Sequence, residues 1–126
     1  MHTKKESFKN RLAQALSANN MKAVDLCERT GIPKSAISYY LAGKSEPRAD
    51  RVQKISAALG VNEPWLLGYD APMARTAEQK KNDAIVDAVL KMQDDAEFFK
   101  VVSDLAELDA ANYESIKRLI SALRNK

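Results

Sequence analysis

Residues 23–42, AVDLCERTGIPKSAISYYLA, decide the fold of this chain. The stretch predicts two short helices joined by a tight corner at Gly31, because glycine takes a positive φ without steric cost. Cys27 is small at the point where the two helices would cross, and Ile37 would fill the contact between them. A larger residue at position 27 or 31 would force the helices apart.

The second of these helices begins near Pro33 and divides into two faces. Ile37, Tyr40 and Leu41 can turn inward at helical spacing. The outward face carries polar and aromatic side chains, which is the layout of a helix presented to a groove of DNA: Lys34, Ser35, Ser38 and Tyr39.

Composition places the chain among folded, largely helical proteins. With 126 residues, 45% of them hydrophobic, it can form one domain, or one small domain with an appendage. The single cysteine excludes an internal disulfide and favours a reducing compartment. No apolar run approaches membrane-spanning length and the start MHTKKE is not a signal peptide, so we expect a cytoplasmic protein with no membrane partner.

Charge is distributed unevenly along the chain. Residues 1–60 carry 11 Lys and Arg against 5 Asp and Glu, whereas residues 61–126 carry 9 against 12. A basic amino-terminal half suits a polyanion, and an acidic tail suits helix packing or a protein partner. An uneven solvated surface would give the same counts, so charge alone does not decide between these interpretations.

Further apolar periodicity predicts helices on both sides of the corner. Ser7 can cap a helix that runs to about Asn19, residues 49–59 repeat apolar side chains at spacings of three and four, and Asn62 can cap a short helix containing Trp65. We therefore expect a five-helix domain over residues 1–68.

The remainder of the chain reads as a connector, residues 69–76, and a helical region, residues 77–126. Thr76 with Gln79, then Asp94 or Asp95, then Asp109 can each begin a helix. About fifty residues are too few to hold a good core alone, so this region must pack on the first domain, on a second copy or on another protein. The apolar residues expected to do so are Phe98, Val102, Leu105, Tyr113, Ile116, Ile120 and Leu123.

Residues 7–68 resemble the helix-turn-helix domain of the lambda-repressor/Cro-like family, often called the XRE family. The resemblance implies an all-α, five-helix lambda-repressor-like DNA-binding domain, followed here by a helical oligomerisation or partner-binding segment. Its closing segment looks most like temperate-phage and mobile-element repressors, and the helical remainder loosely resembles the tails of short phage-type repressors. The residues that carry the resemblance are Leu26, Cys27, Gly31, Ile32 and Ile37, the AGK of residues 42–44, and the ALGVNEPWLLG of residues 58–68.

The resemblance also assigns DNA contacts by position. In the family the first residues of the third helix, and the outward residue one turn later, meet base edges, which implies base reading by Lys34, Ser35 and Tyr39, with Ser38 beside them. The matching loop residues Lys44 and Arg48 would bind phosphate.

Lys22 stands where a helix cap is expected, and lysine is a poor cap. It is either a tolerated surface residue or a further phosphate contact at the positive end of a helix dipole.

Three positions depart from the family pattern. Ala23 stands where a phosphate-binding glutamine is frequent, Pro33 where a Ser or Thr cap is frequent, and Thr30 where leucine is usual. Pro33 is therefore predicted to be an early helix residue with φ already set, and Thr30 is predicted to weaken the local core.

These observations favour a repressor that binds palindromic operators as a homodimer or higher homo-oligomer, in the bacterial cytoplasm at the nucleoid, with an antirepressor as a possible partner. The alternative is an antitoxin-type regulator whose tail binds a toxin. An enzyme of the self-cleaving serine/lysine peptidase type is rejected, because the tail has no strand pattern and is too short for such a domain, and because the only Ala-Gly pair, at residues 42 and 43, ends the second helix of the corner. No other pairing of a nucleophile with a base is expected, since His2 is the sole histidine. No catalytic residue, metal site or cofactor is expected.

Overall fold

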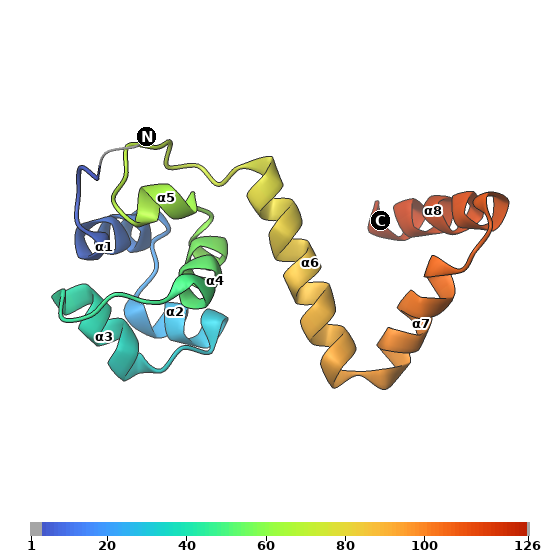
Figure 1. Ribbon diagram of the computed structural model, residues 1–126, viewed down its shortest axis with the longest axis horizontal. Coiled ribbons are helices and arrows are strands. Elements are labelled where there is room, and N and C mark those ends of the chain that lie inside the picture. Colours follow the sequence, from blue (N-terminus) through green and yellow to red (C-terminus); the bar gives the residue numbers. More distant parts are fainter. Residues whose placement is uncertain (1–3, 126) are drawn as a thin grey trace. The chain divides into compact units, whose positions relative to one another are not determined.

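The computed structural model describes residues 4–125, so His2 lies outside the described part of the chain. Within that part the secondary structure is helical, and the chain divides into two compact units at residues 84 and 85. The helices are α1 (Phe8–Ala18), α2 (Ala23–Thr30), α3 (Lys34–Ala42), α4 (Ala49–Leu59), α5 (Glu63–Leu66), α6 (Ala77–Asp94), α7 (Ala96–Ala106) and α8 (Ala110–Arg124) (Figure 1).

The first unit is held together by the apolar faces of α1–α5. α1 packs on α3 and α5, α2 packs on α3 and α4, and α4 packs on α5. This arrangement confirms the predicted five-helix domain. Its core residues are Phe8, Leu12, Ala15, Leu16, Leu26, Ile32, Ile37, Tyr40, Ile55, Leu59, Val61, Trp65 and Leu66.

Helix caps lie where the sequence predicts them. The Ser7 hydroxyl accepts a hydrogen bond from the Asn10 amide at 3.2 Å, and the Asn62 side chain accepts one from the Trp65 amide at 3.0 Å. Thr76 and Gln79 bond each other's backbone amides, which begins α6. The carboxylates of Asp95 and Asp109 accept hydrogen bonds from the amides of Phe98 and Asn112, which caps α7 and α8.

Residues 69–76, expected as a connector, are partly built into the first unit. The Asn62 amide donates to the Met73 carbonyl at 2.8 Å, and Ala74 forms a β-bridge with Val61. Arg75 is buried, with 6% of its surface exposed, and its guanidinium donates to the Val61 carbonyl at 3.0 Å. Sequence periodicity carries no signal for such contacts, because they depend on backbone geometry and on one buried charge.

The charge of Arg75 is matched by carboxylates from two helices. Its Nε lies 2.7 Å from Oδ2 of Asp83, and its Nη2 lies 3.5 Å from Glu63. The hydrogen bonds from Arg75, with a further one from Gln53, hold the pKa of the Asp83 carboxyl below its usual range against the opposing effect of burial. The first two turns of α6 therefore belong to the first unit.

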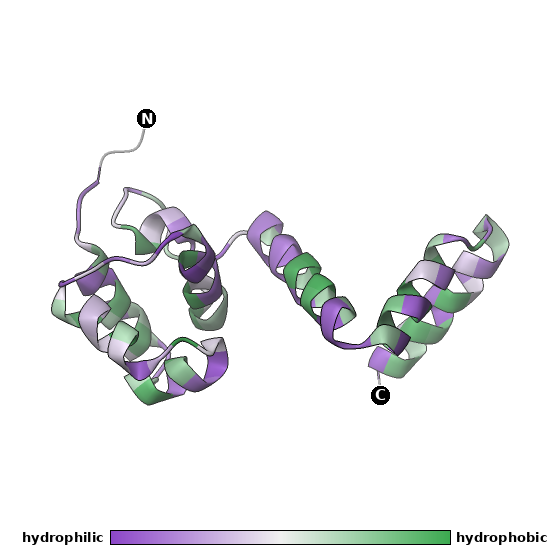
Figure 2. Ribbon diagram, turned by 60° about the horizontal axis from the view of Figure 1, so that its bottom comes forward, coloured by the Kyte–Doolittle hydropathy of each residue, from purple (hydrophilic) through white to green (hydrophobic). Residues whose placement is uncertain are grey.

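The second unit contains the end of α6, α7 and α8, and none of its described residues is buried. Among residues 4–125, ten of the twelve exposed large hydrophobic residues lie in it. Figure 2 shows hydrophobic positions, in green, interspersed with hydrophilic ones, in purple, along the helices of this part of the chain. Exposed apolar surface of this extent is typical of sites of protein–protein contact.

Candidate nucleic-acid interface

The corner between α2 and α3 is closed by backbone and hydroxyl hydrogen bonds. Gly31 has a φ of 75°, and its amide donates to the Cys27 carbonyl at 2.8 Å, which confirms the predicted corner. The Thr30 hydroxyl donates to the Leu26 carbonyl at 2.7 Å and accepts from the Ile32 amide at 3.2 Å. The Thr30 hydroxyl thus links α2 to the turn, and the weakening of the local core by Thr30 stays a prediction.

The start of α2 is stabilised by a residue that the sequence analysis did not single out. Oδ2 of Asp25 accepts a hydrogen bond from the backbone amide of Lys22 at 2.9 Å. An acidic group in the first turn also complements the helix dipole. The Lys22 side chain makes no cap of its own and is exposed, so it is free to meet a phosphate.

Pro33 precedes α3 and is not an early residue of it, so that expectation is wrong. Its φ of −58° suits a helix, but its ψ of 145° is extended, and the helix begins at Lys34. The Pro33 carbonyl accepts hydrogen bonds from the amides of Ala36 and Ile37. Pro33 thus occupies the cap position without a capping side chain.

α3 presents one exposed face and one buried face. Ile37 is fully buried and Tyr40 is 5% exposed, which fixes the rotation of the helix on the core. Within the described chain, the polar groups of the outward residues make no hydrogen bond or ion pair, so their donors and acceptors are free for a ligand. The structure brings these four predicted residues together on the exposed face: Lys34, Ser35, Ser38 and Tyr39.

The loop after α3 carries two exposed cations, Lys44 and Arg48. Gly43 has a φ of 74° and ends the helix, and the Lys44 amide donates to the Tyr39 carbonyl at 2.9 Å. The Lys44 ammonium lies 5.8 Å from the centroid of the Tyr39 ring. Arg48 is exposed at the cap position of α4.

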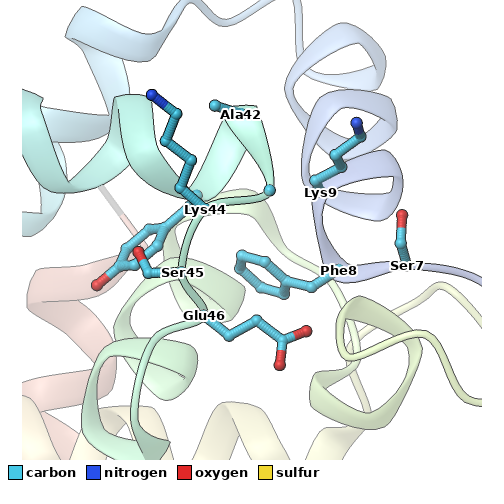
Figure 3. Close-up of a pocket in the computed structure, with 9 residues that line it drawn as sticks. Ser7, Phe8, Lys9, Ala42, Lys44, Ser45 and Glu46 are labelled. Atoms are coloured by element: carbon cyan, nitrogen blue, oxygen red, sulfur yellow. The ribbon is translucent and has the colours of Figure 1, made fainter.

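A cavity of about 550 Å³ lies between the start of α1 and this loop. Figure 3 shows Lys9 and Lys44 directing their ammonium groups to the same side, with the Glu46 carboxylate on the other. The Lys9 stem crosses Gly43, where an added Cβ atom would lie 2.9 Å from Cδ of Lys9. The sequence analysis missed Lys9 because its position depends on how α1 packs against α3.

Residues 4–125 were also compared with the requirements of a metal site and of a membrane-spanning helix. These residues contain no group of three or more His, Cys, Asp or Glu side chains that could hold a metal ion. None of their helices is both long enough and apolar enough to cross a membrane.

The family comparison matches the elements just described. Residues 12–66 match the model of the helix-turn-helix family HTH_3, a range that begins in α1 and ends with α5. These residues are a helix-turn-helix domain of the XRE type. The helix-turn-helix domain supports a DNA-binding transcription regulator, with α3 in the position of the recognition helix.

Whole-chain comparisons add two distant structural likenesses to the helix-turn-helix match. A transcriptional regulator from Listeria innocua is 14% identical with a TM-score of 0.46, over 99% of this chain and 95% of that one. A SinR protein/SinI protein complex is 18% identical with a TM-score of 0.47, over 94% and 99% of the two chains. No curated protein matches the sequence. Because both identities and both TM-scores are low, the assignment of the domain to the helix-turn-helix family rests on the family match alone.

Proposed function

We propose that this protein is a sequence-specific transcriptional repressor of phage or mobile-element type, which binds palindromic operators as a dimer in the bacterial cytoplasm. The observation that carries the proposal is the exposed face of α3, where Lys34, Ser35, Ser38 and Tyr39 have no polar partner in the described chain. Lysine and serine suit the polar edges of bases, and the tyrosine ring suits a thymine methyl group. Occupation of a promoter by such a domain excludes RNA polymerase.

Phosphate contacts would set the orientation of the domain on DNA. Lys44 and Arg48 follow α3, and Lys22 stands at the start of α2, so cations lie at both ends of the helix pair. Such contacts supply affinity without sequence preference. Base reading is thereby assigned to α3, and positioning to its flanks.

The partner of the second unit is proposed to be a second copy of this chain. α7 and α8 carry apolar side chains at helical spacing, and no described residue of this unit is buried. Two-fold homodimers are the commonest soluble oligomers, and a two-fold dimer matches a palindromic operator with half-sites about one helical turn apart. The residues proposed for this contact are Phe98, Val102, Leu105, Tyr113, Ile116, Ile120 and Leu123.

The test combines footprinting on DNA upstream of the protein's own gene with the mass of the protein in solution. The proposal expects a dimer and a two-fold symmetric footprint. Ile120→Asp should reduce the mass to that of a monomer and weaken operator binding. Ser121→Asp adds the same charge at the next, polar position of α8 and should leave the dimer intact.

A monomeric wild-type protein would contradict the proposed dimer. The apolar second unit would then be assigned to a different protein, such as the toxin of an antitoxin-type regulator or an antirepressor. If Ile120→Asp and Ser121→Asp dissociated the dimer to the same extent, the named apolar face would be excluded as the interface.

A further inference from the structure

Tyr40 joins the buried side of α3 to a charged group on α4. Its ring lies in the core, with an edge-to-face contact to Phe8 at a centroid distance of 6.0 Å. Its hydroxyl accepts a hydrogen bond from Nη1 of Arg51 at 3.0 Å. The phenol therefore holds one end of the Arg51 guanidinium from a fixed point in the domain.

The rest of the Arg51 guanidinium makes no polar contact with residues 4–125. Within the described residues, no carboxylate lies within 4.0 Å of it, and Nε and Nη2 make no hydrogen bond. The side chain is half-buried at a cavity of about 420 Å³ between the α3–α4 loop and the start of α4. Arg48, a proposed phosphate ligand, lines the same cavity.

We propose that Arg51 is a further phosphate-binding residue of the DNA interface and that the Tyr40 hydroxyl positions it. This inference rests on the proposed DNA-binding function. The planar guanidinium can donate two parallel N–H bonds to the oxygens of a phosphodiester. A guanidinium that is already held at Nη1 loses less side-chain entropy when it binds. Tyr40 is thus a positioning residue, and Arg51 is the ligand.

Two acidic residues also face this cavity and bear on the proposal. Glu46 lies 3.5 Å from the ammonium of Lys4, so its charge has a partner. Asp50 is exposed and makes no ion pair within the described chain. A phosphate bound by Arg51 would meet the field of Asp50, so neutralising Asp50 should strengthen binding.

The experiment measures binding of the full-length protein to a random-sequence DNA duplex over a series of salt concentrations. Arg51→Ala should weaken binding about tenfold at low salt. It should also reduce the slope of log K against log salt by about one per bound protomer. Tyr40→Phe, which removes only the hydroxyl, should weaken binding about two- to fivefold in the wild type and should have no effect in the Arg51→Ala background. Asp50→Asn should strengthen binding.

Matched controls separate this role from general effects. Lys80→Ala removes the same charge from an exposed position on α6, outside the cavity, and should leave the salt slope almost unchanged. Tyr69→Phe removes a hydroxyl that makes no hydrogen bond in the described chain and should not change binding. If Arg51→Ala lowers helix content, Arg51→Gln replaces it, because glutamine keeps a donor without the charge.

Two results would overturn the inference while leaving the proposed function intact. In the first, the wild-type protein binds the duplex, and the Arg51 variant binds it with an affinity no lower than that of Lys80→Ala. The other is a Tyr40→Phe effect of equal size with and without Arg51, which would make the hydroxyl merely structural. A wild-type protein that binds no duplex at low salt would overturn both the inference and the proposed function.

Discussion

The ammonium nitrogen of Lys44 lies 5.8 Å from the centroid of the Tyr39 ring, so the proposed phosphate ligand and the proposed base reader are in contact. A cation over an exposed aromatic ring contributes about 0.5–1 kcal/mol. Tyr39 is 55% exposed, and Lys44, just after the end of α3, lies over its ring. Loss of Lys44 therefore frees the ring as well as removing a charge.

Substitutions at these two positions should separate sequence reading from phosphate binding. Tyr39→Ala should lower the preference for one operator base pair by about 1–3 kcal/mol, because only that contact is lost. Lys44→Ala should weaken operator and random DNA by similar factors and reduce the salt slope by about one per protomer. Affinities for a set of single-base operator variants, measured at several salt concentrations, provide the check.

Tyr39→Phe is the matched control for the ring, because it keeps the surface that would contact a thymine methyl group. If Tyr39→Ala weakens random DNA as much as the operator, Tyr39 does not read bases. If Lys44→Ala changes the ranking of operator variants, its contact with the ring contributes to sequence preference.

Ser56 is a second specific target, because its hydroxyl is buried on α4 and has no hydrogen-bond partner in the part of the chain that the structure describes. Ser56→Ala should raise the free energy of unfolding by about 1 kcal/mol, since an unpaired buried hydroxyl is costly and alanine favours helices. Urea unfolding followed by the fluorescence of Trp65, the single tryptophan, reports on this unit. Ser17→Ala, an exposed site on α1, controls for helix propensity. A less stable Ser56→Ala protein would mean that the hydroxyl is bonded in solution.

The ion pair between Arg75 and Asp83 should make stability depend on pH. Asp83→Asn should lower the free energy of unfolding at pH 7 by about 1–3 kcal/mol, because Arg75 stays buried with a weaker acceptor.

The sign of the pH dependence follows from the lowered pKa of Asp83 in the folded state. Its stabilisation is complete above the unfolded pKa and is lost as the pH falls through the folded pKa. The difference between the wild type and Asp83→Asn should therefore be constant above about pH 5 and shrink below about pH 4. Urea unfolding at several pH values measures it, with Asp87→Asn on the exposed side of α6 as control. A difference that grows on acidification would contradict the assigned role.

Local and periodic features of the fold could be predicted from the sequence. α4 was expected at residues 49–59, where it lies, because apolar spacing defines its face and Gly60 ends it at a φ of 68°. The corner at Gly31 was predictable because a positive φ favours glycine.

The features that escaped prediction depend on partners distant in sequence or on hydrogen bonds that follow no period. Arg51 meets Tyr40 only because the loop after α3 brings the start of α4 back to that side chain, and Arg75 meets Val61 only after the chain has turned back. Asp25 illustrates the second kind, because its bond to Lys22 replaces a cap that the residue type at position 22 cannot supply. The outward residues of α3 were predictable because exposure follows helical spacing, whereas their effect on DNA is a question for the variants above.

The place at which the first unit ends can be tested by two truncations. A fragment of residues 1–84 retains Asp83, whereas a fragment of residues 1–76 leaves Arg75 buried with Glu63 as its remaining carboxylate. The longer fragment should be more stable by about 1–3 kcal/mol in urea unfolding followed by Trp65 fluorescence. Both fragments lack α7 and α8, so both should be monomers with operator affinity lowered by about 10²- to 10⁴-fold, because the second half-site is no longer tethered. Equal stability of the two fragments would place the boundary before α6, and a dimeric 1–84 fragment would move the proposed interface into the helix-turn-helix unit.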